Sequence, residues 1–161
     1  MKWKDLLEEW GMTNLKISVG FAQAQFAPKD GDREAAWQLY IELLTRIATQ
    51  PLPEESGDEK AALDSVYSIF GLTREIIRAG GTDCVEFTKI AIVVLNQIIR
   101  PFTAHWHRQS LAGALNDPQQ CARFRADLKE LQKPLLNYTR MLGHMAGVED
   151  LTELEALESS C

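Results

Sequence analysis

Hydrophobic residues recur along most of this chain at the three- and four-residue spacing of amphipathic α-helices. The pattern predicts a short first helix over residues 3–10, with Gly11 directly after it as a stop signal. The same spacing predicts longer helices over 33–50, 58–79 and 83–102, each bounded by proline, glycine or a capping aspartate. The chain is therefore predicted to be mainly α.

The most regular pattern lies in the C-terminal half. From Cys121 to Met145 the apolar residues step alternately by three and four, which is heptad spacing and predicts a seam between packed helices. Asp117 is expected to cap this helix and Gly147 to end it. Two prolines fall inside predicted helices, so we expect Pro101 to kink or end its helix and Pro134 to bend the last one.

Residues 13–28 follow a different pattern. Apolar and polar residues alternate over 15–19, Gly20 interrupts, and 21–26 looks extended before Pro28. This pattern fits either a short β-hairpin or an extended arm that packs on the helices or on another chain. The predicted fold is a single helical bundle of four to six helices with this short extended or β-hairpin segment near the N-terminus.

Length, composition and charge narrow the classes of protein. The 161 residues suit one domain over 1–161, and 45% hydrophobic with 25% charged residues is ordinary for a folded protein. An acidic tail occupies about 148–161. The net charge of −6 disfavours broad nucleic-acid binding, although a local basic patch stays possible.

Cysteine spacing and hydropathy predict the cellular location of the protein. Cys84, Cys121 and Cys161 lie far apart and are odd in number, which excludes a disulfide framework and favours a reduced, cytoplasmic protein. The N-terminus lacks the apolar core of a signal peptide. The most hydrophobic run, 90–99, contains Gln97 and is too short for a membrane span, so no membrane association is expected.

Arg100 is followed by His105 and His107, at R-x4-H and R-x6-H spacing. This spacing resembles the signature of HEPN ribonucleases, in which an Arg and a His of one helix, usually doubled in a dimer, face RNA. The resemblance implies metal-independent catalysis, in which the guanidinium stabilises charge on the phosphate and the imidazole moves a proton. Pro101 departs from that pattern. The alternative interpretation is an Arg at a helix end beside surface histidines.

No metal site and no cofactor is predicted. His105 and His107 are two residues apart and point to different faces of a helix, and neither has structural zinc spacing to His144 or Cys121.

Three stretches carry a second resemblance: AAWQLYIELLTRIATQPL, KIAIVVLNQIIRPFTAHWH and FRADLKELQKPLLNYTRMLGHMAGVEDLT. Together they resemble small helical accessory proteins of bacterial conflict and antiphage defence loci. The resemblance implies a partner-binding role beside a larger effector.

Two hypotheses of function follow. The first is a non-catalytic accessory protein that assembles with a larger effector or with itself. The expected contact regions are the arm over 13–28, the acidic tail over 148–161 and the surroundings of Trp106. The expected contact residues are Leu15, Ile17, Phe21, Phe26, Trp106, Leu151, Leu154 and Leu157. The alternative is a metal-independent ribonuclease or RNA-binding toxin that uses Arg100 with His105 or His107.

Overall fold

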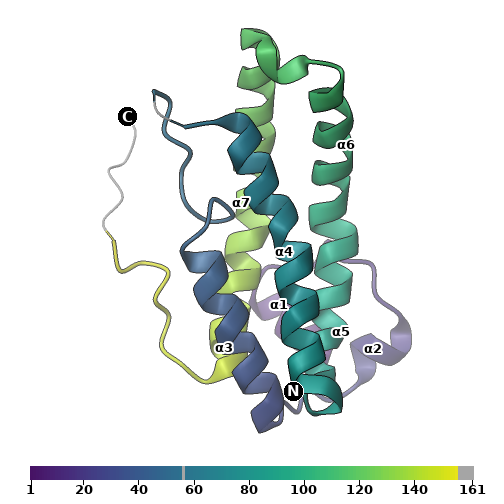
Figure 1. Cartoon of the computed structure of the whole chain (residues 1–161). Coiled ribbons are helices and arrows are strands. Elements are labelled where there is room, and N and C mark those ends of the chain that lie inside the picture. The colour runs from purple at the N-terminus through teal and green to yellow at the C-terminus, as the bar shows by residue number, and fades with distance from the viewer. Residues whose placement is uncertain (56, 156–161) are drawn as a thin grey trace.

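The computed structural model describes residues 1–55 and 57–155, and over these residues the chain forms a helical bundle (Figure 1). The mainly α fold predicted from the sequence is confirmed. The α-helices are α1 (Trp3–Glu9), α2 (Val19–Gln23), α3 (Asp30–Leu44), α4 (Glu59–Gly80), α5 (Val85–Val94), α6 (Arg100–Leu111) and α7 (Pro118–Ala146). Helices α3, α4 and α7 lie beside the rod formed by α5 and α6. No described helix combines the length and apolar character needed to cross a bilayer.

Several helix ends form where the sequence predicts them. The Asp58 carboxylate accepts hydrogen bonds from the amides of Lys60 and Ala61, at 2.8 and 3.2 Å, at the start of α4. The Asp117 carboxylate accepts from the amide of Gln119 at 3.1 Å at the start of α7. Gly147 ends α7 with a positive φ of 73°, a conformation that costs glycine little.

The helix was predicted to continue to residue 50, directly before Pro51. Helix α3 instead ends at Leu44, six residues earlier. Polar side chains of the residues that follow stabilise this early end, because they donate hydrogen bonds to the last carbonyls of the helix. The Thr49 hydroxyl donates to the carbonyl of Leu43 at 2.6 Å, and the Gln50 amide donates to that of Leu44 at 2.8 Å. These bonds replace the helical ones, so the backbone turns away while its carbonyls stay satisfied.

The β-hairpin alternative for 13–28 is wrong. The Ser18 hydroxyl accepts from the amide of Phe21 at 3.1 Å and so caps the short helix α2. Beyond α2 the chain is extended and pairs with the first residues of the protein through a single antiparallel bridge between Lys2 and Gln25. The cap at Ser18 therefore stabilises a short helix where the alternating pattern predicted extended chain. The arm is extended only before and after α2.

Pro101 does not end its helix. The segment Leu95–Ile99 forms a π-helical turn, in which the amide of Arg100 donates to the carbonyl of Leu95. Proline in an α-helix clashes with the carbonyl four residues earlier, and a wider turn moves that carbonyl away. The rod therefore continues from α5 into α6, and α7 likewise continues past Pro134.

The heptad stripe of α7 forms a seam within the chain. Its residues Phe124, Leu128, Leu131, Leu135, Tyr138, Leu142 and Met145 are all buried. They pack against α3, α4 and α6. The seam is thus filled by the chain's own helices rather than left for a second copy.

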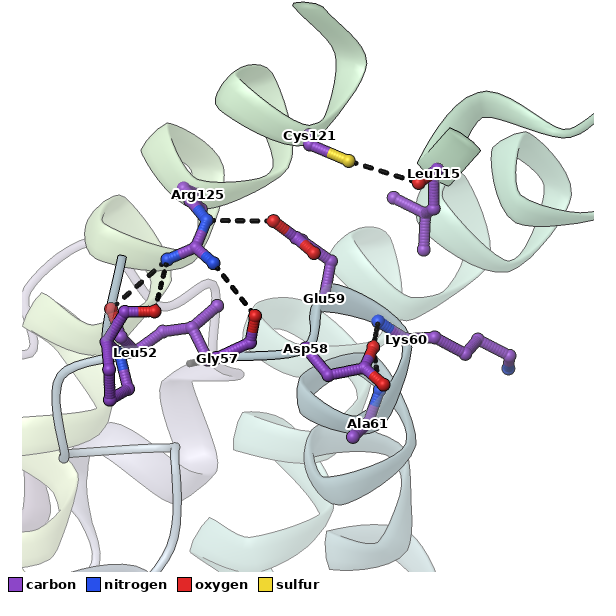
Figure 2. A network of polar contacts seen from close by, with 10 residues as sticks. Leu52, Gly57, Asp58, Glu59, Lys60, Ala61, Leu115, Cys121 and Arg125 are labelled. Atoms are coloured by element: carbon purple, nitrogen blue, oxygen red, sulfur yellow. Dashed lines mark hydrogen bonds and ion pairs between the residues drawn. The ribbon is translucent and has the colours of Figure 1, made fainter. Parts of the chain in front are cut away.

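Arg125 of α7 fixes the linker before α4 (Figure 2). Its guanidinium donates to the Glu59 carboxylate at 2.9 Å and to the carbonyls of Leu52, Pro53 and Gly57 at 3.2, 3.0 and 3.1 Å. The planar fork of arginine suits several acceptors at once. The linker between α3 and α4 is therefore held against α7.

Cys121 lies beside this network, and its thiol contacts the turn before α7. Its thiol donates to the carbonyl of Leu115 at 3.1 Å. Burial and the charge of Glu59 raise the pKa of the Cys121 thiol, against the opposing effect of Arg125. Fewer thiolates then form at neutral pH.

Asp32 is a buried carboxylate that caps two helices. One oxygen accepts from the amide of Lys29 at 2.8 Å at the start of α3. The other accepts from the amide of Phe87, the third residue of α5, at 2.9 Å. Asp32 is only 1% exposed and its bond to the Phe87 amide is buried, so water cannot replace the carboxylate there. The bond to the Lys29 amide is partly buried.

We expect Asp32→Ala to lower the free energy of unfolding by roughly 2 to 4 kcal/mol, because it leaves two amides without acceptors. Asp30→Ala removes a fully exposed carboxylate from the same turn, so its loss of stability should be much smaller than that of Asp32→Ala. Urea unfolding followed by circular dichroism measures both. Equal losses in the two variants would contradict the double-cap role.

Candidate functional site

A groove of about 850 Å³ lies between α6 and α7 and is closed on a third side by residues 11–16. We call it the α6–α7 groove. Most of its lining is apolar, with polar side chains around the edge. The lining residues are Gly11, Met12, Asn14, Leu15, Lys16, Gln97, Ile98, Pro101, Phe102, His105, Trp106, Asp127, Glu130, Leu131 and Pro134.

Trp106 joins the two helical walls. Its indole is 1% exposed, and its Nε1 donates to the Asp127 carboxylate of α7 at 3.0 Å. The ring packs edge-on against Phe124, with centroids 5.2 Å apart. Phe102, one turn earlier on α6, packs on the same Phe124 at 5.5 Å. Aromatic contacts and a charge-assisted hydrogen bond thus set the distance between α6 and α7.

Gln97 holds the third wall in place. Its Oε1 accepts from the backbone amide of Lys16 at 2.8 Å, and its Nε2 donates to the carbonyl of the same residue at 2.7 Å. This two-bond pairing imitates a strand edge and fixes Leu15 beside the groove. Gln97 lies within the π turn that precedes Pro101, so the local helix irregularity is at the groove itself.

The groove edge carries charges of both signs. Lys16 lies on the third wall, while Asp127 and Glu130 lie on α7. Glu130 is paired with Lys133 at 2.8 Å, but both side chains are about 70% exposed, so this ion pair contributes little. His105 also lines the groove and packs edge-on against Trp106 at 5.0 Å.

Two of the predicted contact residues, Leu15 and Trp106, line this groove. The other residues of the arm serve the core instead. Phe21 and Phe26 contact the buried Trp3 with ring centroids 4.9 and 5.0 Å apart, and Ile17 also packs against the core. Their apolar surface is therefore largely covered by the chain itself.

The tail is also bound to the bundle. Arg140 of α7 donates to Thr152 at 3.1 Å and to the Glu153 carboxylate at 2.9 Å. The amide of Leu151 donates to the Tyr40 hydroxyl at 2.7 Å. Leu151 packs against the core, and Leu154 is 75% exposed. Leu157 lies outside the described residues.

Asp150 supports this docking of the tail. Partial burial would raise its pKa, but two hydrogen bonds from Thr152 and the charge of Arg140 lower it below the ordinary value of 3.8. The carboxylate is therefore ionised at neutral pH, and the attraction to Arg140, 3.6 Å away, is present there.

Arg100, His105 and His107 do not share one site. Arg100 points toward α4, where its guanidinium lies 4.8 Å from the centroid of the Phe70 ring. His105 lines the α6–α7 groove, which includes neither Arg100 nor His107. His107 lies on the α4 side and packs on Tyr67 at 4.8 Å. Arg100 and His107 thus share a face but are two turns, about 10 Å, apart along the helix.

Metal-site geometry is absent from the part of the chain that the structure describes, where no group of three or more His, Cys, Asp and Glu side chains converges.

Sequence reasoning missed Gln97 and Asp127 as groove residues. For Gln97 a signal existed, because a polar side chain interrupts the most apolar run of the chain. Asp127 gave none, since an acid on a helix surface is ordinary.

No family model, curated protein or solved structure matches this chain. The case for function therefore rests on the geometry of its own residues.

We expect Gln97→Ala to free residues 12–16 from the rod, because it removes both hydrogen bonds to Lys16. Amide hydrogen exchange at Lys16 should then become about tenfold faster or more, which corresponds to roughly 1.4 kcal/mol. Asn96→Ala is the matched control, because Asn96 contacts only the exposed Arg100 side chain. Unchanged exchange in Gln97→Ala would show that the wall is held by packing alone.

Proposed function

We propose that this protein is a non-catalytic interaction protein whose α6–α7 groove binds an apolar segment of a partner protein. One observation carries the proposal: a groove of about 850 Å³ with an apolar lining and three walls held in fixed positions. The resemblance of its helical stretches to accessory proteins of antiphage loci supports a role beside a larger effector in bacterial defence.

The chemistry of the lining favours apolar side chains over a polar small molecule. Ile98, Phe102 and Leu131 contribute apolar surface from both helices. The Gln97 amide uses both of its polar atoms on Lys16, and Asp127 already accepts from Trp106. The other polar side chains of the lining are Asn14, Lys16, His105 and Glu130, and Glu130 is paired with Lys133. The apolar surface is therefore the larger feature that a partner would contact.

The fixed walls lower the cost of binding. Trp106 and Asp127 set the separation of α6 and α7, and Gln97 holds residues 12–16. A partner would then meet a surface that is already ordered, and less conformational entropy is lost on association. The same argument makes the groove a better candidate than the arm or the tail, whose apolar residues mostly face this chain.

The proposal predicts that Ile98→Glu weakens capture of the partner. In a tagged pull-down from the native host, after nuclease treatment, we expect the stoichiometric partner to be reduced about tenfold or more, because a carboxylate would be buried without a counter-charge. Ile98→Ala should have a smaller effect in the same direction. Mass spectrometry with isotope-labelled controls quantifies the bound protein.

Ile92→Glu is the matched control. Ile92 lies on the same rod, is 50% exposed and does not line the groove. It should leave the captured partner unchanged, and thermal unfolding checks that all variants fold. Equal loss in Ile92→Glu and Ile98→Glu, or no loss in either, would remove the groove from the proposal.

A second candidate, RNA binding or cleavage at Arg100 and His107, has one observation in its favour. Arg74 also approaches the Phe70 ring, at 5.7 Å, so two guanidiniums lie near one aromatic side chain beside Tyr67 and His107. Phe70 is only 3% exposed, but Tyr67 is 53% exposed. An exposed aromatic side chain near arginines is a common feature of single-stranded nucleic-acid sites.

The non-catalytic proposal expects purified protein to leave RNA intact. Labelled single-stranded and structured RNAs, incubated with the wild type and resolved on denaturing gels, provide the measurement. The Arg100→Ala/His107→Ala double variant controls for contaminating nuclease. Cleavage by the wild type that the double variant lacks would favour the ribonuclease instead.

A further inference from the structure

Helix α3 is apolar on two faces. Its inner face is buried against the bundle and includes Leu39 and Leu43, neither of which is exposed to solvent. Its outer face carries Trp37 and Ile41, which are four residues apart and each 37% exposed. A helix that is apolar around most of its circumference is normally covered on all sides, so this outer face is unusual for a surface helix.

The outer face of α3 forms one wall of a second groove, of about 530 Å³, against α4. We call it the α3–α4 groove. Trp37 and Ile41 face Leu72, Ile76 and Ala79 across it. The α4 residues recur at helical spacing, so two apolar stripes run side by side. Such paired stripes are the surface into which a third amphipathic helix packs.

Carboxylates line both sides of this groove. Glu34 and Glu42 come from α3 and Glu75 comes from α4, and the lining contains no lysine or arginine. Glu42 is paired with Arg46 at 2.9 Å. Among the described residues, Glu34 and Glu75 have no cation within ion-pair distance, and Glu34 accepts only from Gln38. The groove therefore presents an apolar floor between unneutralised acids.

We propose that the α3–α4 groove binds a cationic amphipathic helix of a partner protein. Its apolar side chains pack on Trp37 and Ile41, and its lysines or arginines lie near Glu34 and Glu75. A charge placed opposite on each rim fixes the orientation of the helix and excludes acidic segments.

A second copy of this chain fits the groove poorly. A two-fold interface would place the same patch against itself, so Glu34 and Glu75 would face Glu34 and Glu75 of the copy. The tail of this chain is acidic as well. Charge complementarity thus selects a cationic partner.

This site is independent of the proposed function. The two grooves share no lining residue, and α4 lies between α3 and α6 (Figure 1). The chain therefore has room for two partners at once.

The test uses a synthetic 18-residue amphipathic peptide of leucine and lysine, fluorescently labelled, and its leucine–glutamate counterpart. Fluorescence anisotropy at about 0.15 M salt, where long-range attraction is screened, measures binding to the full chain. The lysine peptide should bind saturably and the glutamate peptide should not. Glu34→Gln/Glu75→Gln and, separately, Trp37→Ala should each weaken binding about fivefold or more.

Glu8→Gln/Glu9→Gln is the matched control, because it removes the same charge from exposed positions on α1. It should leave affinity unchanged. An equal loss in the α1 control would show non-specific attraction and overturn the proposal. So would binding that Trp37→Ala leaves intact, absence of saturable binding, or a wild-type dimer in sedimentation that Trp37→Ala abolishes.

Discussion

The apolar stripe of α7 is the surface on which the rest of this molecule is assembled. It is buried from Phe124 to Met145, and α3, α4 and α6 all pack against it. Burial of this stripe removes a large apolar area from water, which is the main favourable term in folding. Residues of the stripe and beside it also take part in the surface grooves. Leu131 lines the α6–α7 groove, and Leu136 beside the stripe lines a groove with the tail.

Side-chain to backbone hydrogen bonds then decide how the connecting segments lie. Asp32 ties the start of α3 to that of α5, Arg125 holds the linker before α4, and Gln97 holds residues 12–16. Each one satisfies backbone groups that leave regular structure, which would otherwise be costly to bury. Of these segments, the one with Leu15 and Lys16 lines the α6–α7 groove, so Gln97 contributes to the shape of that groove.

The two grooves differ in chemistry, and this difference is the reason why we propose different partners for them. The α6–α7 groove has an apolar lining and mixed charge at its edge, whereas the α3–α4 groove has acids on both sides. On these grounds we propose that the protein is an adaptor that joins two partners. In this proposal the protein recruits a larger effector in bacterial defence, and no role in catalysis is assigned to Arg100 or the histidines.

The sequence by itself determined the helices, most of their ends and the residues of the seam. Helical periodicity and caps such as Asp58 and Asp117 act within a few residues, so they are visible in one stretch of chain. The sequence pattern was misleading at 13–28, where a helix capped by Ser18 forms in place of a hairpin. It was also misleading at Pro101, because a π turn before the proline lets the helix continue.

Only the tertiary structure decided which apolar side chains remain exposed on the surface. It packed Phe21 and Phe26 against Trp3 and left Trp37 and Ile41 partly exposed. It also gave Arg100 and His105 different neighbours. These outcomes depend on contacts between residues far apart in the chain, such as Gln97 with Lys16 and Trp106 with Asp127. Local spacing sets the face of a helix on which a side chain lies, but the packing of whole helices sets what that face meets.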